Sequence, residues 1–253
     1  MNIKILALDF DGTVFDTAYE CYVAALKTFN KMGEELEDKP DILEKFMKAR
    51  VFVKAAGDFY LVLKAIKEGS LDFDKLTQEE FNQKNKELDK MGGEFSRLFY
   101  QIRDGMRKDD FDGWIKLHRE CQGARETLKQ LSRDYRIVVT TTNDKKSISI
   151  FMGLLGVKVD SILDKSVSMD KRVHIQIIMD KYKAKPEEVL FIDDILEHIL
   201  AVKKTGINTV MAGWGYSNQQ QRGEAREKGI RVLESIKDLP GFLAAKPAVQ
   251  EDN

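Results

Sequence analysis

The fold of this chain is decided by residues 3–14, which read IKILALDFDGTV. Residues 3–8 are mostly apolar and rich in branched side chains, and they predict a short buried strand. Asp9 and Asp11 follow at once, and Gly12 allows the chain to turn sharply behind them. Because open α/β sheets bind ligands beyond the carboxyl ends of their strands, we expect both carboxylates to face a substrate. Their repulsion, roughly 4 kcal/mol at about 4 Å and an effective dielectric of about 20, would be offset by a divalent cation.

Polar side chains also follow a second predicted strand, over residues 136–140. Thr141, Thr142 and Asn143 stand between this strand and the predicted helix 145–155. Hydroxyls and free backbone amides at the start of a helix suit a phosphoryl group. Thr and Asn also serve as plain helix N-caps, so binding and capping both remain open at this point.

A second acidic pair, Asp193-Asp194, follows the apolar residues 189–192. Four carboxylates at the strand ends of one parallel sheet would repel one another unless a cation lay among them. Mg²⁺ prefers oxygen ligands and would resolve this conflict, whereas helix capping would account for Asp194 alone. Lys171 begins the helix before this strand and could extend its ammonium toward the same edge, with Lys165 as a rival candidate.

The composition excludes several classes of function. The 253 residues include 41 basic and 42 acidic side chains, and the net charge of -1 gives no field to attract nucleic acid or an anionic membrane. The two cysteines, Cys21 and Cys121, match no disulfide framework or metal spacing, which indicates a cytoplasmic protein. No apolar run approaches about 18 residues and the chain begins directly with a strand, so we expect neither secretion nor membrane insertion.

The order of the predicted elements indicates an α/β core with a helical insertion. Residues 17–120 have helical periodicity, including a capping box at Thr77 and a buried face that Gly92-Gly93 is expected to kink. From residue 121 onward helices and strands alternate, which predicts a parallel sheet flanked by helices. The expected divisions are a core of residues 1–16 and 121–242, a helical insertion of residues 17–120 and a flexible tail of residues 243–253.

These features resemble the haloacid dehalogenase superfamily, in the branch whose helical cap is inserted after the first strand of a Rossmann-like core. Residues 9–16, DFDGTVFD, are similar to the first family motif, and the resemblance covers most of the chain. Thr141 takes the place of the second-motif hydroxyl, with Thr140 and Thr142 as alternative registers. Lys171 is similar to the lysine of the third motif.

The fourth, acidic motif of this family is matched by Asp193-Asp194, but the chain departs from the commonest phosphatase pattern around it. Asp193 stands where glycine is common, His198 stands where a further aspartate often occurs, and Arg172 follows Lys171 in place of proline. The Asp-Asp form is similar to the magnesium-dependent phosphatase variant. Asp194 is therefore favoured as the direct metal ligand, with Asp193 binding directly or through water.

The resemblance implies an enzyme, a magnesium-dependent phosphatase that hydrolyses a small phosphorylated metabolite through an aspartyl-phosphate. Asp9 would be the nucleophile, and Asp11 would protonate the leaving alkoxide and then activate water. The implied metal ligands are Asp9, the backbone carbonyl of Asp11, Asp193 and Asp194. The implied phosphoryl-binding residues are Thr141, Thr142 and Lys171.

Two alternatives to a phosphatase remain open. A phosphosugar mutase would share every core motif, and a catalytically silent binding or regulatory protein could use the same fold. The clustered acids speak against a silent protein, and Asp11 speaks against a dehalogenase because a halide leaves without a proton. In the cap, Arg50 and Lys54 lie one helical turn apart and could meet an anionic group of the substrate, although solvated helix charges are the simpler explanation. We expect no nucleic acid or membrane partner. We expect the protein to be a monomer or a homodimer.

Overall fold

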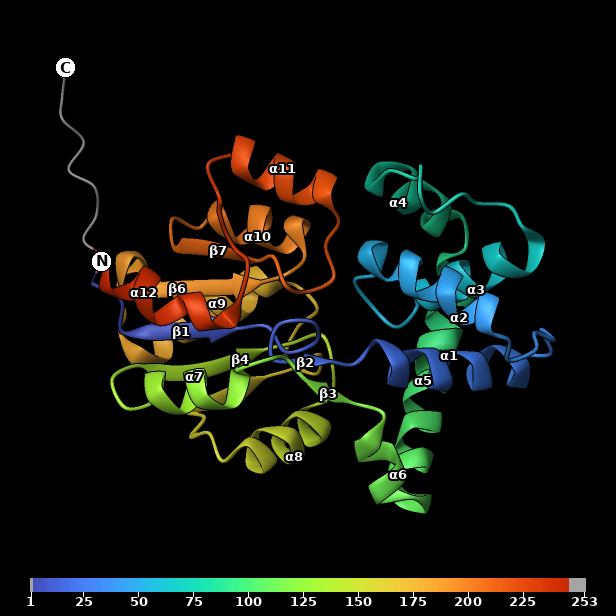
Figure 1. Ribbon diagram of the computed structural model, residues 1–253, viewed down its shortest axis with the longest axis horizontal. Coiled ribbons are helices and arrows are strands. Elements are labelled where there is room, and N and C mark those ends of the chain that lie inside the picture. The colour runs from blue at the N-terminus through green and yellow to red at the C-terminus, as the bar shows by residue number, and fades with distance from the viewer. Residues whose placement is uncertain (1, 246–253) are drawn as a thin grey trace. The chain divides into compact units, whose positions relative to one another are not determined.

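Six parallel strands form the sheet that carries the acidic pairs, in the order β5-β4-β1-β6-β7-β8 (Figure 1). The computed structural model describes residues 2–245 of the chain. The strands are β1 (Ile5–Leu8), β4 (Arg136–Thr140), β5 (Ser161–Leu163), β6 (Val189–Asp193), β7 (Asn208–Ala212) and β8 (Arg231–Leu233). All four residues of β1 are apolar and buried, as a strand in the interior of a parallel sheet requires.

The central strand β1 is paired on both sides, and the pairing brings three strand ends to one level. Leu8 pairs with Val139 of β4 and with Ile192 of β6. Residues 9, 140 and 193, which come next in the three segments, therefore lie side by side at the carboxyl edge of the sheet. This carboxyl edge is where parallel α/β sheets bind their ligands.

Helices pack against this sheet and complete the first compact unit, which comprises residues 2–16 and 120–245. Ile175 and Ile178 of α9 (Lys171–Tyr182), with Ile199 and Val202 of α10 (Leu196–Lys203), share one apolar cluster with residues of the sheet. The parallel sheet flanked by helices confirms the predicted fold class. The helical segments are α7 (Ala124–Leu131), α8 (Lys145–Leu155), α9 (Lys171–Tyr182), α10 (Leu196–Lys203), α11 (Gln219–Glu227) and α12 (Leu239–Ala244), with the 3-10 turns η2 (Pro186–Glu188) and η3 (Ile236–Asp238).

Residues 17–119 form a second compact unit, which is helical. Aromatic side chains fill its centre: Phe46 stacks on Phe59 with ring centroids 5.1 Å apart, and Phe52 stacks on Phe81 at 5.7 Å. Its elements are α1 (Ala18–Lys31), α2 (Pro40–Ala49), η1 (Arg50–Phe52), α3 (Asp58–Glu68), α4 (Gln78–Glu87), α5 (Asp89–Asp109) and α6 (Phe111–Lys116). The short strands β2 (Phe15–Asp16) and β3 (Arg119–Glu120) pair with each other.

Gly92 and Gly93, where a kink is predicted, lie inside one helix, and Gly92 serves a packing contact. Helix α5 runs unbroken through both glycines. Gly92 is buried against Gly57. A Cβ added at Gly57 would lie 2.8 Å from the carbonyl oxygen of Gly92. The glycine pair therefore serves the close approach of two backbone segments, a use of glycine that local periodicity does not reveal.

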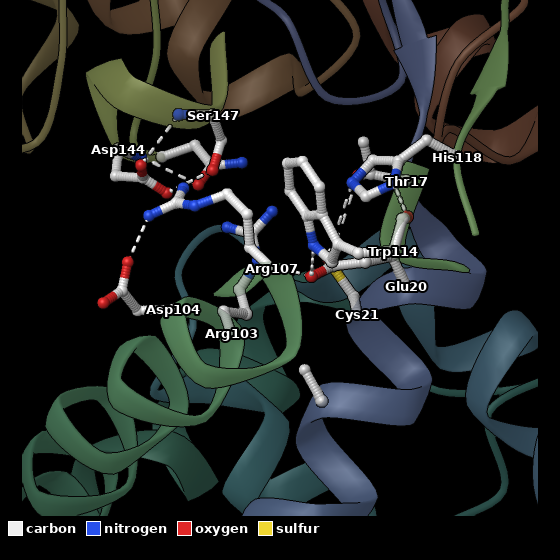
Figure 2. Close-up of polar contacts among 12 residues, drawn as sticks. Thr17, Glu20, Cys21, Arg103, Asp104, Arg107, Trp114, His118, Asp144 and Ser147 are labelled. Carbon is white, nitrogen blue, oxygen red and sulfur yellow. Dashed lines mark hydrogen bonds and ion pairs between the residues drawn. The ribbon is translucent and has the colours of Figure 1, made fainter. Parts of the chain in front are cut away.

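A buried ion pair links three segments of the helical unit (Figure 2). Glu20 of α1 has no solvent exposure, and its Oε1 accepts from Arg103 Nε at 2.6 Å and from Trp114 Nε1 at 3.2 Å. Nε2 of His118 lies 4.0 Å from the other oxygen of the same carboxylate. A carboxylate buried this deeply is tolerated only because the Arg103 guanidinium and the indole N–H stabilise its charge.

The predicted tail of residues 243–253 begins too early. Leu243 and Ala244 belong to α12, and Leu243 is buried in the first unit because the helix turns its apolar side inward. Residues 246–253 of that prediction lie outside the described part of the chain. Within residues 2–245, no helix combines the length and the apolar character that crossing a bilayer needs.

Candidate active site

Asp9 is the first residue after β1 and is 5% exposed. Its backbone N–H donates to the carbonyl of Ile192 at 2.8 Å, which extends the pairing of β1 with β6 by one residue. The chain then turns back on itself, and the carbonyl of Phe10 accepts the N–H of Val14 at 2.8 Å. The strand pairing and the turn together hold the Asp9 side chain at the carboxyl edge of the sheet.

Asp194 occupies the space that two glycines leave open. Gly12 has φ +82°, and a Cβ at Gly12 would overlap the Asp194 carboxylate, while a Cβ at Gly215 would lie 2.6 Å from the same Oδ2. That Oδ2 accepts the backbone N–H of Tyr216 at 2.6 Å, and the Tyr216 hydroxyl donates to Asp16 Oδ1 at 2.8 Å. The glycines therefore allow the loops after β1 and β7 to close around a fully buried carboxylate.

Lys171, the first residue of α9, extends its ammonium between the strand ends. Its Nζ contacts the Asp9 carboxylate, donates to the Thr140 carbonyl at 2.7 Å and lies 3.4 Å from Asp193 Oδ2. Burial works to lower the pKa of Lys171, but the carboxylates of Asp9 and Asp193 outweigh burial and raise it. The site therefore contains a permanent, almost fully buried cation in contact with Asp9.

The charges around Asp9 favour a further cation. Burial raises the pKa of Asp9 well above its usual range, and Asp193 and Asp194 raise it further, against the lowering effect of Lys171. One carboxylate oxygen each of Asp9, Asp193 and Asp194 lies within 4.8 Å of the others. Three buried oxygen donors at this spacing match the ligands that Mg²⁺ prefers, and the ion would lower the pKa of Asp9. The donor set therefore fits a divalent cation.

The two adjacent aspartates have different surroundings. Asp193, the last residue of β6, accepts the N–H of Ile195 at 2.8 Å and faces Lys171 and His198. Burial alone would raise the pKa of Asp193, but His198 and Lys171 overcome it and lower the pKa to about 2. Asp194 contacts the loop of Tyr216 instead. The two aspartates thus differ in their protein partners, although one oxygen of each lies in the same cluster with Asp9.

Asp11 is held at the edge of the site by Asn143. Nδ2 of Asn143 lies 3.2 Å from both Oδ1 and Oδ2 of Asp11. Thr141 is fully buried, and its Oγ1 accepts the backbone N–H of Asn143 at 3.0 Å, while Thr142 is half-buried beside it. The actual N-cap of α8 is Asp144, whose Oδ1 accepts the Ser147 N–H, so capping does not account for the two threonines.

The structure thus brings together Asp9, Lys171, Asp193 and Asp194, and it places Asp11 and Thr141 at the same strand ends. Sequence reasoning assigned no role to Tyr216 or His198, and it grouped Asn143 with the threonines as a phosphoryl-binding or capping residue, whereas the structure shows Asn143 in contact with Asp11. Asn143 had a signal in its position after β4, beside the threonines. Tyr216 acts through its backbone N–H, and no side-chain pattern reveals such a contact.

The rival candidate Lys165, the cap residues Arg50 and Lys54, and Cys121 have contacts or surroundings that set them apart from the site of Asp9. The backbone N–H of Lys165 donates to the Asn143 carbonyl at 3.2 Å, whereas Lys171 is the lysine that reaches Asp9. Burial, with Asp194 nearby, raises the pKa of Cys121 to about 12, which is unsuited to a thiolate nucleophile. In the helical unit, Arg50 is buried and donates to the Val53 carbonyl at 3.0 Å, and Lys54 Nζ donates to Asn82 at 2.8 Å.

Comparison with known proteins decides the family. The model of the haloacid dehalogenase-like hydrolases matches residues 3–206, which include both acidic pairs and Lys171. The chain belongs to this family. Curated relatives include the pyrophosphatase PpaX of Bacillus mycoides, 29% identical over 140 residues, and that of Bacillus cereus, 28% identical over 148 residues. These matches cover 51% and 55% of this chain and 62% of each relative, so the chain spans about three fifths of the relatives' length.

Solved structures of haloacid dehalogenase-like proteins share the fold over almost the whole chain. One, a haloacid dehalogenase-like family hydrolase from Streptococcus pneumoniae, is 17% identical with a TM-score of 0.66 and covers 96% of this chain and 99% of its own. Another, described as a predicted phosphoglycolate phosphatase from Haemophilus somnus, is 15% identical with a TM-score of 0.67 and the same coverage. At these identities the similarity establishes the fold of this family member and leaves its substrate to the chemistry of the site.

Proposed function

We propose that this haloacid dehalogenase-like hydrolase is a magnesium-dependent phosphatase that hydrolyses a small phosphate monoester through an aspartyl-phosphate on Asp9. The observation that carries the proposal is the contact of the buried Asp9 carboxylate with Lys171, beside the carboxylates of Asp193 and Asp194. A nucleophile, a fixed cation and a set of metal ligands at one sheet edge are what phosphoryl transfer requires. Family membership and the PpaX relatives support hydrolysis of a phosphate bond.

Mg²⁺ would be held by Asp9, the backbone carbonyl of Asp11 and Asp194. When bound, the ion supplies positive charge that neutralises phosphoryl oxygens and keeps Asp9 ionised. Asp193 is the less suited direct ligand, because Lys171, His198 and the Ile195 N–H already stabilise its charge.

The residues of the chain divide the remaining tasks. An Asp9 oxygen attacks phosphorus, and the ester oxygen departs with a proton from Asp11. Asp11, held by Asn143, then accepts a proton from the water that attacks the phosphorus of the aspartyl-phosphate, which regenerates Asp9 and releases phosphate. Lys171 and Thr141, with Thr142 beside it, would bind the non-bridging oxygens, and Lys171 balances charge as the bond to Asp9 forms.

The substrate class follows from the family and the site together. We propose a small phosphorylated metabolite, selected by a helical cap of residues 17–120 on a core of residues 1–16 and 121–242. Inorganic pyrophosphate is included among the candidates because the curated relatives are pyrophosphatases. A cytoplasmic location and action without a nucleic acid or membrane partner are part of the same proposal.

The decisive experiment traps the intermediate. The protein is incubated with Mg²⁺ and an aryl phosphate, pyrophosphate or sugar phosphates, quenched in acid and treated with hydroxylamine, which converts an acyl phosphate into a hydroxamate that mass spectrometry locates. We expect the label on Asp9, with more of it in the Asp11→Asn variant, because the intermediate then hydrolyses slowly. Asp9→Asn should abolish both label and turnover, while Asp134→Asn, an exposed aspartate of the same unit, should change neither. Turnover without label on Asp9, or an active Asp9→Asn protein, would refute the proposal.

A further inference from the structure

His198 occupies a defined place behind the site. It lies in the first turn of α10, and its side chain is 15% exposed. Nδ1 lies 3.1 Å from Oδ2 and 3.3 Å from Oδ1 of Asp193. An ionised carboxylate can only accept hydrogen bonds, so Nδ1 is the ring nitrogen that donates, whether the imidazole is neutral or charged.

The Asp193 carboxylate is held from three directions. His198 Nδ1 faces both oxygens, the Ile195 N–H donates to Oδ1 at 2.8 Å, and Lys171 Nζ approaches Oδ2 at 3.4 Å. The terminal torsion of an aspartate is soft, so its orientation is set by donors such as these. The same Oδ2 that faces Lys171 is the oxygen nearer to His198.

We propose that His198 is a positioning residue, which fixes the Asp193 carboxylate so that Asp193 in turn directs the Lys171 ammonium at Asp9. The catalytic consequence rests on the proposed phosphatase function, whereas the chain of contacts from His198 to Lys171 does not. His198 contacts Asp193, and its effect reaches the reacting atoms through Lys171. The two adjacent aspartates thereby divide their work: Asp193 orients a cation of the protein, and Asp194 is left for the metal.

Two replacements of His198 separate positioning from helix stability. In His198→Asn, the amide Nδ2 stands close to the position of the imidazole Nδ1 and can donate to Asp193. In His198→Leu, the donor is lost, although leucine is the better helix former of the two. If His198 only supported α10, the leucine variant would be the less damaged one. Lys203→Leu, on an exposed position of the same helix, controls for an added leucine.

The first readout needs no enzymatic activity. Reductive methylation of the protein, followed by mass spectrometry, compares the reactivity of Lys171 with that of Lys129, an exposed lysine on α7. We expect the relative reactivity of Lys171 to rise about tenfold in His198→Leu, because a hydrogen bond to a charged group that fixes its partner is lost. It should stay within about twofold of the wild type in His198→Asn and in Lys203→Leu. Equal reactivity of Lys171 in all four proteins would overturn the proposal.

The second readout is steady-state kinetics with an aryl phosphate at increasing Mg²⁺. We expect kcat to fall about tenfold in His198→Leu, with KM and the half-saturating Mg²⁺ concentration within about threefold of the wild type, and His198→Asn to recover most of kcat. A kcat that recovers at saturating Mg²⁺ would place His198 at the metal and overturn the proposal, as would equal impairment of the leucine and asparagine variants. If the wild type hydrolyses no phosphate, the proposed function fails, and the reactivity of Lys171 still decides whether His198 positions it.

Discussion

His174 makes the stability of the folded chain depend on pH. It lies in α9, three residues after Lys171, and has no solvent exposure. Burial, with the positive charge of Lys171 adding to it, lowers the pKa of His174 from 6.5 to about 4, and the backbone of Asp164 and Ser168 opposes this only in part. His174 is therefore neutral in the folded protein at any pH where the enzyme would work.

The size and the sign of the effect follow from these two pKa values. Between about pH 4 and pH 6.5 the unfolded chain binds a proton at His174 and the folded protein does not, so the free energy of unfolding rises with pH. The stabilisation is complete above the unfolded pKa of 6.5 and is lost as the pH falls through the folded value of about 4. This stabilisation amounts to about 3 kcal/mol, because a pKa difference of one unit corresponds to about 1.4 kcal/mol.

The assay compares urea unfolding of the wild type and His174→Leu at a series of pH values from about 7.5 down to about 4. Removal of the ring changes packing by an amount that does not depend on pH, so the difference between the two proteins isolates the titration. We expect the wild type to lose about 3 kcal/mol relative to His174→Leu across this range. A difference that stays constant with pH would refute the reasoning, because it would show that His174 titrates alike in the folded and unfolded states.

Three further changes have defined outcomes. Arg103→Met should destabilise the protein by about 3 kcal/mol or more in thermal unfolding, because Glu20 loses its buried cation. The additional change Glu20→Gln should restore part of the lost stability, and additive effects of the two changes would contradict this reasoning. Asp11→Asn should lower kcat/KM, which reports formation of the aspartyl-phosphate, by about 100-fold or more with an alkyl phosphate and much less with an aryl phosphate, whose leaving group needs no proton; equal losses of kcat/KM would exclude the acid role. Gly12→Ala should abolish activity, because its Cβ overlaps the Asp194 carboxylate and its φ of +82° disfavours alanine, and a fully active variant would show that the loop can shift.

The core of the site could be predicted because it depends on local sequence and on one general rule. Each buried strand is a short apolar run, and the polar residues that follow it are visible in the sequence. The rule that parallel strands present their carboxyl ends at one edge then brings Asp9, Asp193 and Asp194 together without knowledge of any contact, whereas Lys171 was preferred to Lys165 through the resemblance to the family. The pairing of Leu8 with Val139 and Ile192 is the structural form of that rule.

The features that could not be predicted depend on partners far away in the sequence. The sequence predicted a kink at Gly92, but it did not reveal that glycine is needed there because the backbone of Gly57 lies close by. The capping box at Thr77, in contrast, is confirmed, because both of its partners lie within one helical turn. The Tyr216 N–H reaches Asp194 only because the loop after β7 returns to the sheet edge. Local pattern thus predicts elements and caps, while contacts between elements require the fold.

The charge balance of the site shows that a contribution to stability does not explain its buried carboxylates. Asp9, Asp193 and Asp194 are almost completely buried, and burial of an ionised carboxylate costs several kcal/mol even after relaxation. Lys171 supplies one full positive charge, and His198 further stabilises Asp193, so negative charge remains around Asp9 and Asp194. Two neutral side chains of similar size would fold at lower cost in a silent protein. This charge is what the proposed divalent cation and incoming phosphoryl group would balance, which favours the proposed catalysis over a binding role on the same fold.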